Sequence, residues 1–306
     1  MNDFTAKSRG IRRSIRMRAP LFLLPAFICF AISFIVPFAQ GIYLSFCDFN
    51  IPKDASWTGL DNYSAVFADP SFGSAFRNTF FFTLASVIVI NIPAFLLAMF
   101  LSEKFRGVSL FRTAFFIPNL IGGVVLGYIW SMIFDGILHY FGTYLTASPT
   151  FGFWALVILV AWQQIGYMMI IYIAGFQSIP SDMLEAADID GASPVQRLFR
   201  IVLPNMLSAI SVCVFLTLTN GFKLFDQNLA LTGGAPIKTL ENGMQIKTTE
   251  LLALNIYSTY NINRNWHGTA QAKAVIFFLL VGVMALTQQV LTNREKRSGK
   301  KGADKA

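Results

Sequence analysis

The sequence predicts an all-α membrane protein with six transmembrane helices, and two observations carry this prediction. Of its 306 residues, 55% are hydrophobic and only 13% are charged, whereas soluble domains contain about 25% charged residues. Long windows also lack Asp, Glu, Lys and Arg entirely, and a helix needs about 20 apolar residues to cross the hydrocarbon core. A chain of this composition cannot cover a water-facing surface, so we expect membrane lipid to solvate part of it.

The charge-free windows define the six predicted spans in order. The windows are residues 19–47, 78–102, 113–134, 136–181, 201–222 and 274–293. The fourth window is too long for one crossing, and its first part, Gly136 to Gly152, contains the glycine and proline residues of a turn-rich connection. Within a transmembrane domain over 21–293, we therefore predict spans at about 21–46, 76–101, 111–134, 153–176, 205–226 and 270–292.

The basic residues predict the orientation of these spans. If the N-terminus is cytoplasmic, 17 of the 24 Lys and Arg residues lie on the cytoplasmic side, as the positive-inside rule requires. We expect a basic N-terminal segment over 1–20 and a basic tail over 294–306, both cytoplasmic, in a multi-pass protein of the cell membrane. Because basic flanks beside apolar spans suit anionic headgroups, the net charge of +8 does not indicate a nucleic-acid partner.

The sequence contains no recognisable catalytic or metal-binding set. It lacks the Gly-x-x-x-x-Gly-Lys-Ser/Thr phosphate loop, so we do not expect this chain to hydrolyse ATP itself. The three cysteines, Cys29, Cys47 and Cys213, lie in or beside apolar runs and are expected to be small buried hydrophobic residues rather than metal ligands. We expect a non-catalytic membrane subunit that binds no cofactor of its own.

The predicted cytoplasmic loop between spans four and five, residues 181–204, contains the signals of two short helices. Ser181 is placed to cap the first helix, and Gly191 suits the left-handed position after its end. Ser193 is placed to cap the second helix, with Pro194 at its first position.

The first loop helix is a candidate for contact with a partner. Ala186, Ala187 and Ala192 leave little side-chain bulk, so the helix could enter a groove closely, and Glu185 offers a charged hydrogen-bond acceptor there. The residues alone leave open the alternative that this is a solvated helix which packs only on its own bundle.

The same loop holds a spaced pattern, which is Glu185-Ala186-Ala187, Gly191 and Ile201-x-Leu203-Pro204. With this spacing and in this loop, the pattern resembles the signature of ABC importer permeases that work with a solute-binding protein. Three further stretches are similar to the carbohydrate branch of that family, the maltose- and glycerol-phosphate-type permeases: Phe111 to Pro118, Trp162 to Gln177 and Leu231 to Pro236.

The resemblance implies a type I importer fold in which the loop 181–204 carries a cytoplasmic coupling helix that docks on a separate ATPase. The coupling residues that it implies are Glu185, Ala186, Ala187, Asp190, Gly191 and Ala192. It also implies the partners: a second homologous permease subunit, usually an unlike one, two copies of an ABC ATPase that use ATP and Mg, and an extracellular solute-binding protein. That protein would deliver a sugar or oligosaccharide.

Polar residues within spans four and five are the candidates for the solute pathway, because such residues usually face the bundle interior or a water-filled cavity. They are Gln163, Gln164 and Tyr167 in span four and Thr217, Asn220 and Gly221 in span five. Amides and hydroxyls can recognise sugars by hydrogen bonds. The alternative is that these groups only join neighbouring helices, at about 0.6 kcal/mol each.

Two alternatives for the function stay open at this point. Within the same class, the solute could be a molecule other than a sugar, such as glycerol phosphate. In a different class, a self-sufficient secondary transporter would be expected to carry ionisable residues deep in its spans, or paired broken helices, whereas the spans predicted here are almost free of charge.

Overall fold

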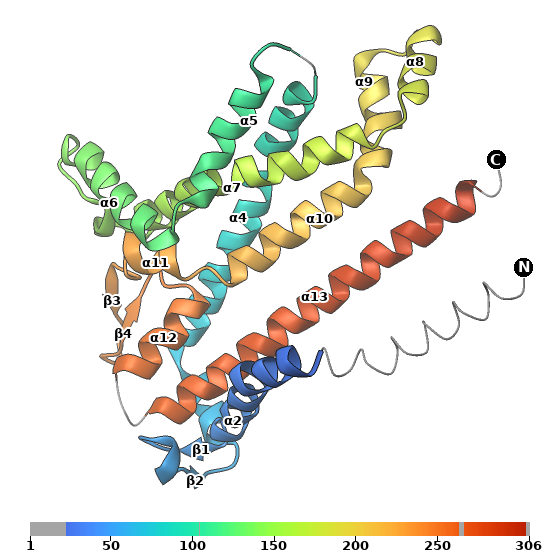
Figure 1. The fold of residues 1–306 in the computed structure, drawn as a ribbon. Coiled ribbons are helices and arrows are strands. Elements are labelled where there is room, and N and C mark those ends of the chain that lie inside the picture. The colour runs from blue at the N-terminus through green and yellow to red at the C-terminus, as the bar shows by residue number, and fades with distance from the viewer. Residues whose placement is uncertain (1–22, 104, 263–265, 304–306) are drawn as a thin grey trace, which may run out of the picture.

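The computed structural model describes residues 23–103, 105–262 and 266–303. The predicted basic segment 1–20 and the last residues of the tail 294–306 therefore lie outside the described residues. Figure 1 shows a bundle of long helices that lean apart toward one end and carry two small β hairpins at the other. We call these the α8 end, after α8 (Ser181–Ile189), and the hairpin end.

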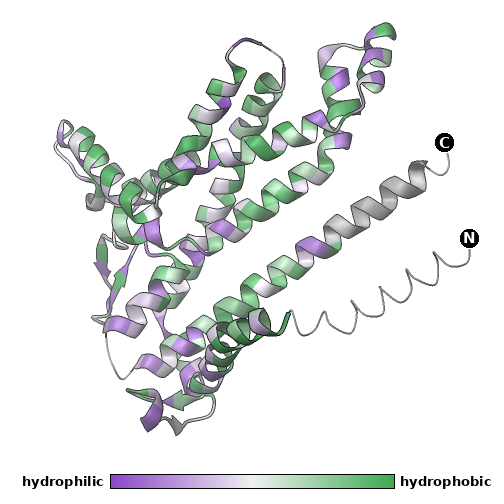
Figure 2. Cartoon of the chain, viewed as in Figure 1, coloured by the Kyte–Doolittle hydropathy of each residue, from purple (hydrophilic) through white to green (hydrophobic). Residues whose placement is uncertain are grey.

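Within the described residues, five helices are long and apolar enough to cross a membrane. They are Leu23–Leu44, α4 (Pro70–Leu101), α7 (Pro149–Gln177), Pro194–Phe222 and α13 (His267–Ala303), whose apolar part ends at Val290. The first of them contains a π-helical turn, Ala31–Ile35, before α2 (Val36–Leu44). Figure 2 shows apolar residues along these helices, with polar residues gathered toward the hairpin end and on the projection at the α8 end.

The third predicted span, 111–134, is not one straight helix. It is built from α5 (Val108–Phe116), a 3-10 turn (Ile117–Leu120) and α6 (Gly123–His139). The two helices meet at an angle of 98°, and only as a bent pair do they supply a sixth span. The bend has a local cause, because Pro118 lacks a backbone N–H and Gly122 adopts an extended conformation at the break.

The fifth span begins earlier and ends earlier than the predicted 205–226. Its segments are α9 (Pro194–Arg197), a π-helical turn (Leu198–Val202) and α10 (Leu203–Phe222). The helix therefore runs on through Pro204, which lies in the first turn of α10. The wider π-helical turn before it accommodates the proline, so α9 and the span form one unbroken helix over Pro194–Phe222, which changes direction between α9 and α10 (Figure 1).

Short elements cover the hairpin end. They are β1 (Cys47–Asp48), a 3-10 turn (Pro52–Asp54), β2 (Ser56–Trp57), α3 (Asp61–Ala68), a 3-10 turn (Leu145–Ala147), α11 (Asp226–Leu231), β3 (Ile237–Thr239), β4 (Gln245–Lys247) and α12 (Leu252–Ile262). The strands pair antiparallel, β1 with β2 and β3 with β4, with Cys47 opposite Trp57 and Lys238 opposite Ile246.

The core of the bundle lies where α4, α7 and α10 pack against one another. In α7, 61% of the apolar window is buried within this chain, whereas none of the window in Leu23–Leu44 is. The first span therefore presents its apolar side chains to lipid or to another subunit. At the far end of the chain, α13 continues as a helix to Ala303, so the described part of the basic tail is helical.

Candidate functional site

Gly191 ends α8 in the left-handed conformation that the sequence predicts. Its φ is 72°. Its N–H donates to the carbonyl of Asp188 at 3.2 Å, and the N–H of Ala192 donates to the carbonyl of Ala187 at 2.9 Å. This pair of bonds is the Schellman arrangement, which satisfies carbonyls left open at a helix end. A residue with a Cβ would be strained at this position.

A capping box begins α9, also in agreement with the sequence. Ser193 Oγ accepts a hydrogen bond from the N–H of Gln196 at 3.3 Å, and Gln196 Oε1 accepts one from the N–H of Ser193 at 2.9 Å. Pro194 occupies the start of the helix, where its missing N–H has no consequence. The turn between α8 and α9 is thus fixed by hydrogen bonds on both sides.

The predicted cap at Ser181 is wrong. The N-cap position of α8 falls on Pro180, and Ser181 Oγ donates to the carboxylate of Asp182 at 3.3 Å instead. The two loop helices are joined further by an ion pair of 3.1 Å between Arg197 and Asp188. Because both side chains are largely exposed, this pair contributes less than about 1 kcal/mol.

The predicted coupling residues divide between two faces of the loop helices. Glu185, Ala186, Asp190 and Gly191 are exposed, Ala192 is half-buried and Ala187 is buried. Figure 1 shows α8 at the tip of a projection beyond the rest of the bundle. The acidic, small-residue face is therefore free to meet another protein.

Large apolar side chains on the same projection were missed by reasoning from the sequence. They are Met183, Ile189, Val195 and Phe199, and Ile189 is 86% exposed. Exposed apolar side chains grouped on a projecting element are typical of a protein contact. The sequence offered no signal that separates them from Leu184 and Leu198 of the same loop, which are half-buried.

Among the predicted pathway residues, Thr217 belongs to a buried network that joins three helices. Its Oγ1 accepts from Asn91 Nδ2 at 3.0 Å and donates to the carbonyl of Cys213 at 2.9 Å, and Asn91 Oδ1 accepts from the hydroxyl of Tyr172 at 2.9 Å. This network ties α4 to α7 and α10. Thr217 also lines a narrow cavity beside the network.

Gln163 is buried, and its side chain bonds to the backbone at the bend in the third span, between α5 and α6. Its Nε2 donates to the carbonyl of Ile121 at 3.0 Å, and its Oε1 accepts from Gln227 Nε2 at 2.7 Å. The amide of Gln163 is therefore hydrogen-bonded at both ends, to Gln227 of α11 and to Ile121, which lies between α5 and α6. Tyr167, one turn along α7, is half-buried and packs against the apolar core.

Gln164 and Asn220 come from α7 and α10 and line two cavities together. The larger cavity is about 300 Å³ and is also lined by Lys223, Asp226 and Gln227. The smaller is about 10 Å³ and is also lined by Ser86, Thr217 and Gly221, and its volume is that of about one water molecule. The two cavities thus share Gln164 and Asn220, and the space is narrow on the side of Ser86, Thr217 and Gly221.

Three side-chain oxygens beside the smaller cavity are buried with no hydrogen-bond partner among the described residues: Thr83 Oγ1, Ser86 Oγ and Gln164 Oε1. Thr83 lies against Gly221, whose missing side chain permits the contact. An unsatisfied buried polar group costs about 1–3 kcal/mol, so these atoms suit a partner that enters between α4, α7 and α10. The α4 hydroxyls gave no sequence signal, because a helical Ser or Thr usually bonds a carbonyl of its own preceding turn.

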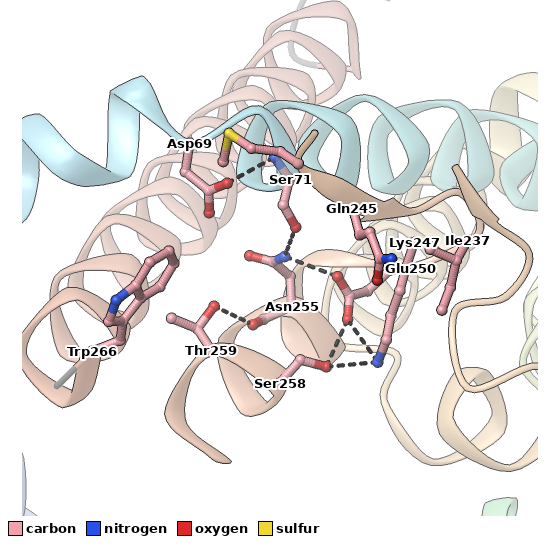
Figure 3. Close-up of a pocket in the computed structure, with 11 residues that line it drawn as sticks. Asp69, Ser71, Ile237, Gln245, Lys247, Glu250, Asn255, Ser258, Thr259 and Trp266 are labelled. Atoms are coloured by element: carbon pink, nitrogen blue, oxygen red, sulfur yellow. Dashed lines mark hydrogen bonds and ion pairs between the residues drawn. The ribbon is translucent and has the colours of Figure 1, made fainter. Parts of the chain in front are cut away.

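A separate pocket of about 470 Å³ lies at the hairpin end. Its walls come from the start of α4, the β3–β4 hairpin, α12 and Trp266, and Figure 3 shows their polar side chains joined by hydrogen bonds and ion pairs. We call it the hairpin-end pocket. The sequence did not reveal it, since its walls lie far apart along the chain.

Apolar spanning helices, polar side chains between α4, α7 and α10, and a capped helix pair that projects from one end together define a membrane transport subunit. Residues 65–297 match the family described as binding-protein-dependent transport system inner membrane component. The match covers more than half of the chain, and this protein therefore belongs to that family of multi-pass transport permeases.

Relatives extend over nearly the whole chain. A probable starch degradation products transport system permease protein, AmyD, of Thermoanaerobacterium thermosulfurigenes is 40% identical over 90% of this chain and 94% of that protein. An sn-glycerol-3-phosphate transport system permease protein, UgpA, of Agrobacterium fabrum is 32% identical over 90% of this chain and 94% of that protein.

Solved structures share the fold. The crystal structure of a bacterial alginate ABC transporter in complex with an alginate pentasaccharide-bound periplasmic protein contains a chain with a TM-score of 0.73 and 21% identity, over 92% of this chain and 96% of that one. At this identity the likeness concerns the fold, which is that of a type I importer permease.

Proposed function

We propose that this chain is the membrane-spanning subunit of an ATP-driven importer and passes a sugar or oligosaccharide that an extracellular solute-binding protein delivers. The observation that carries the proposal is the projecting α8, where Glu185, Ala186 and Gly191 are exposed and the helix end is fixed by the left-handed glycine. The name of the 40%-identical relative, a permease for starch degradation products, supports a saccharide as the solute.

In this proposal the chain hydrolyses no ATP and binds no cofactor. Two copies of a separate ATPase use ATP and Mg, and α8 of this chain docks on one of them through Glu185, Ala186 and the apolar Ile189. A second, unlike permease subunit covers part of the apolar surface of the first span. Co-purification followed by mass spectrometry identifies the chains bound to this protein and so tests these proposed partners. Recovery of the chain without any ATPase would contradict the proposal.

The α8 end is proposed to be cytoplasmic and the hairpin end external, with both termini inside. Cysteine substitutions at Ser56 or Thr239, in a background without the native cysteines, should react with an impermeant thiol reagent added to intact cells, whereas one at Ser193 should not. All three positions are exposed, so the labelling reports the side of the membrane rather than burial. Reaction of position 193 from outside would overturn the orientation.

The proposed solute path runs between α4, α7 and α10. It begins in the cavity of about 300 Å³ and is closed at Gln164 and Asn220. The unpaired oxygens of Ser86 and Gln164 would accept hydrogen bonds from solute hydroxyls when this point opens. We assign Gln163 to the support of the broken span and not to solute, because its amide is occupied on both sides.

Gln164→Leu and Asn220→Leu should each lower uptake about five-fold, since a hydrogen bond contributes about 1 kcal/mol. Ser86→Ala should act in the same direction. Uptake of a labelled oligosaccharide, subunit assembly and the affinity of the binding protein are measured together, and only uptake should change. Gln177→Leu, an exposed position at the α8 end of the same helix, is the matched control. Normal uptake in both Gln164→Leu and Asn220→Leu would make these residues links between helices.

The competing solute is glycerol phosphate, which the Agrobacterium fabrum relative is named for. The exposed ammonium of Lys223 in the larger cavity favours it, although Asp226 lines the same cavity. Uptake assays with both solutes separate the two cases. A self-sufficient secondary transporter, the alternative from another class, would keep transporting in cells that lack the partner ATPase.

A further inference from the structure

We propose that the hairpin-end pocket is a second binding site, for one unit of a neutral saccharide, on the external face of the permease. The inference rests on the proposed function for its orientation and solute class. The site is distinct from the path at Gln164 and Asn220, because the two sets of lining residues do not overlap. Its volume of about 470 Å³ lies in the range of small-molecule sites.

One wall of the pocket is held by a buried ammonium group. Lys273, which is 0% exposed, donates to Asp69 Oδ2 at 2.7 Å, to Asn255 Oδ1 at 2.9 Å and to Thr259 Oγ1 at 2.7 Å. All three of its protons are therefore used, and α13 is tied to the start of α4 and to α12. A wall fixed in this way is formed before any ligand arrives.

The opposite wall is organised by a buried carboxylate. Glu250 accepts from Ser258 Oγ at 2.6 Å and from Asn255 Nδ2 at 2.9 Å, and it lies 3.6 Å from Lys247 Nζ. Figure 3 shows these side chains meeting at one side of the pocket, with Trp266 across from them. Asn255 bonds to both walls, so they form one connected network.

The charges of this network cancel. Asp69 is paired with Lys273, and Glu250 with Lys247, so the network contains two acidic and two basic groups among the described residues. Within that part of the chain, a phosphate or carboxylate ligand would find no cation that lacks an acidic partner, and an amine would find no anion that lacks a basic one. A neutral ligand with many hydroxyl groups is the class that suits these walls.

Several groups stay available to such a ligand. Lys247 is about one-third exposed, donates to Ser258 Oγ at 3.2 Å and lies 3.6 Å from Glu250 Oε1, so its ammonium group can still donate to a ligand. Ser71 Oγ accepts from Asn255 and retains its own proton, and the exposed amide of Gln245 lines the same space. Trp266 adds a half-exposed aromatic surface on which a sugar ring can stack.

The test uses the full chain in proteoliposomes, with the native cysteines replaced and Gln245→Cys as a reporter. Glucose, maltotriose and raffinose are the neutral probes, and sn-glycerol 3-phosphate is the charged one. At ten times its Kd, a bound sugar should slow maleimide labelling of position 245 about ten-fold, and sn-glycerol 3-phosphate should leave the rate unchanged. Trp266→Ala should remove the protection, whereas Trp57→Ala, an exposed tryptophan outside the pocket, should keep it.

Two results would overturn the site. One is an unchanged labelling rate with all three neutral sugars. The other is protection by the solute-binding protein alone and by none of the sugars, which would assign the pocket to a protein contact. Uptake by the Gln164→Leu variant is measured independently. If the pocket binds no sugar but this variant still shows the expected loss of uptake, the pocket proposal fails and the proposed import function stands. Unchanged gel-filtration behaviour of Trp266→Ala shows that the variant is folded.

Discussion

Gly191→Val is expected to lower uptake steeply while the chain still reaches the membrane at normal abundance, and Glu185→Lys is expected to do the same. At the φ of 72° found for Gly191, an L residue is disfavoured by about 1 kcal/mol or more. The added side chain also thickens the exposed end of α8, and the lysine reverses the charge on that surface. Uptake should fall at least about ten-fold, which corresponds to ~1.4 kcal/mol of lost coupling.

The same two variants should retain the ATPase poorly on co-purification, or let it hydrolyse ATP without a response to solute. Gly282→Val and Glu241→Lys make the same chemical changes where Gly282 has open space around it and Glu241 lies near the hairpin end. Both controls should transport normally. Full uptake together with full ATPase retention in Gly191→Val and Glu185→Lys would defeat the coupling role of α8.

Gly166→Ala is expected to disrupt the third span and to lower the stability of the whole bundle. A Cβ at Gly166 would overlap the carbonyl carbon and oxygen of Phe115 and lie 2.9 Å from the backbone nitrogen of Phe116. These are backbone atoms, so no change of rotamer relieves the overlap, and we expect a destabilisation of about 3 kcal/mol. The abundance of the chain in the membrane and its thermal unfolding midpoint in detergent should both decrease.

Gly136→Ala is the matched control for this change. Gly136 lies in α6, and a Cβ there would meet no atom within 4 Å. Alanine also favours the helix by about 1 kcal/mol relative to glycine, so the unfolding midpoint should stay the same or increase. If Gly166→Ala unfolds at the midpoint of the unchanged protein, α5 does not pack on α7 through this glycine.

Features that depend on a few neighbouring residues were predicted correctly from the sequence. The left-handed end of α8 at Gly191 and the capping box at Ser193 follow from side chains that act within one helical turn. The bend in the third span also has a local cause, in the proline and glycines around Pro118. The long apolar run 113–134 nevertheless led to the prediction of a single span without a bend. Apolar length predicts that a segment spans the membrane and does not report its shape.

The neighbours Gln163 and Gln164 show where sequence reasoning stops. Both are amides in the same span, yet one supports Ile121 and Gln227 while the other lines the cavities with Asn220. Adjacent helical residues point about 100° apart, and only the packing of α4, α10 and α11 around α7 decides which amide meets a neighbour and which meets open space.

The sequence by itself determined that this chain is a membrane protein with about six spans and a loop helix pair, because apolar length and capping signals are properties of short segments, and its spaced loop pattern indicated the permease family by resemblance. Only the tertiary structure decided the rotation of each helix, the unpaired hydroxyls of Thr83 and Ser86, and the hairpin-end pocket. In that pocket Asp69 meets Lys273 from 204 residues away. Contacts at such separations depend on how rigid helices pack against one another, and that information is not contained in any local run of residues.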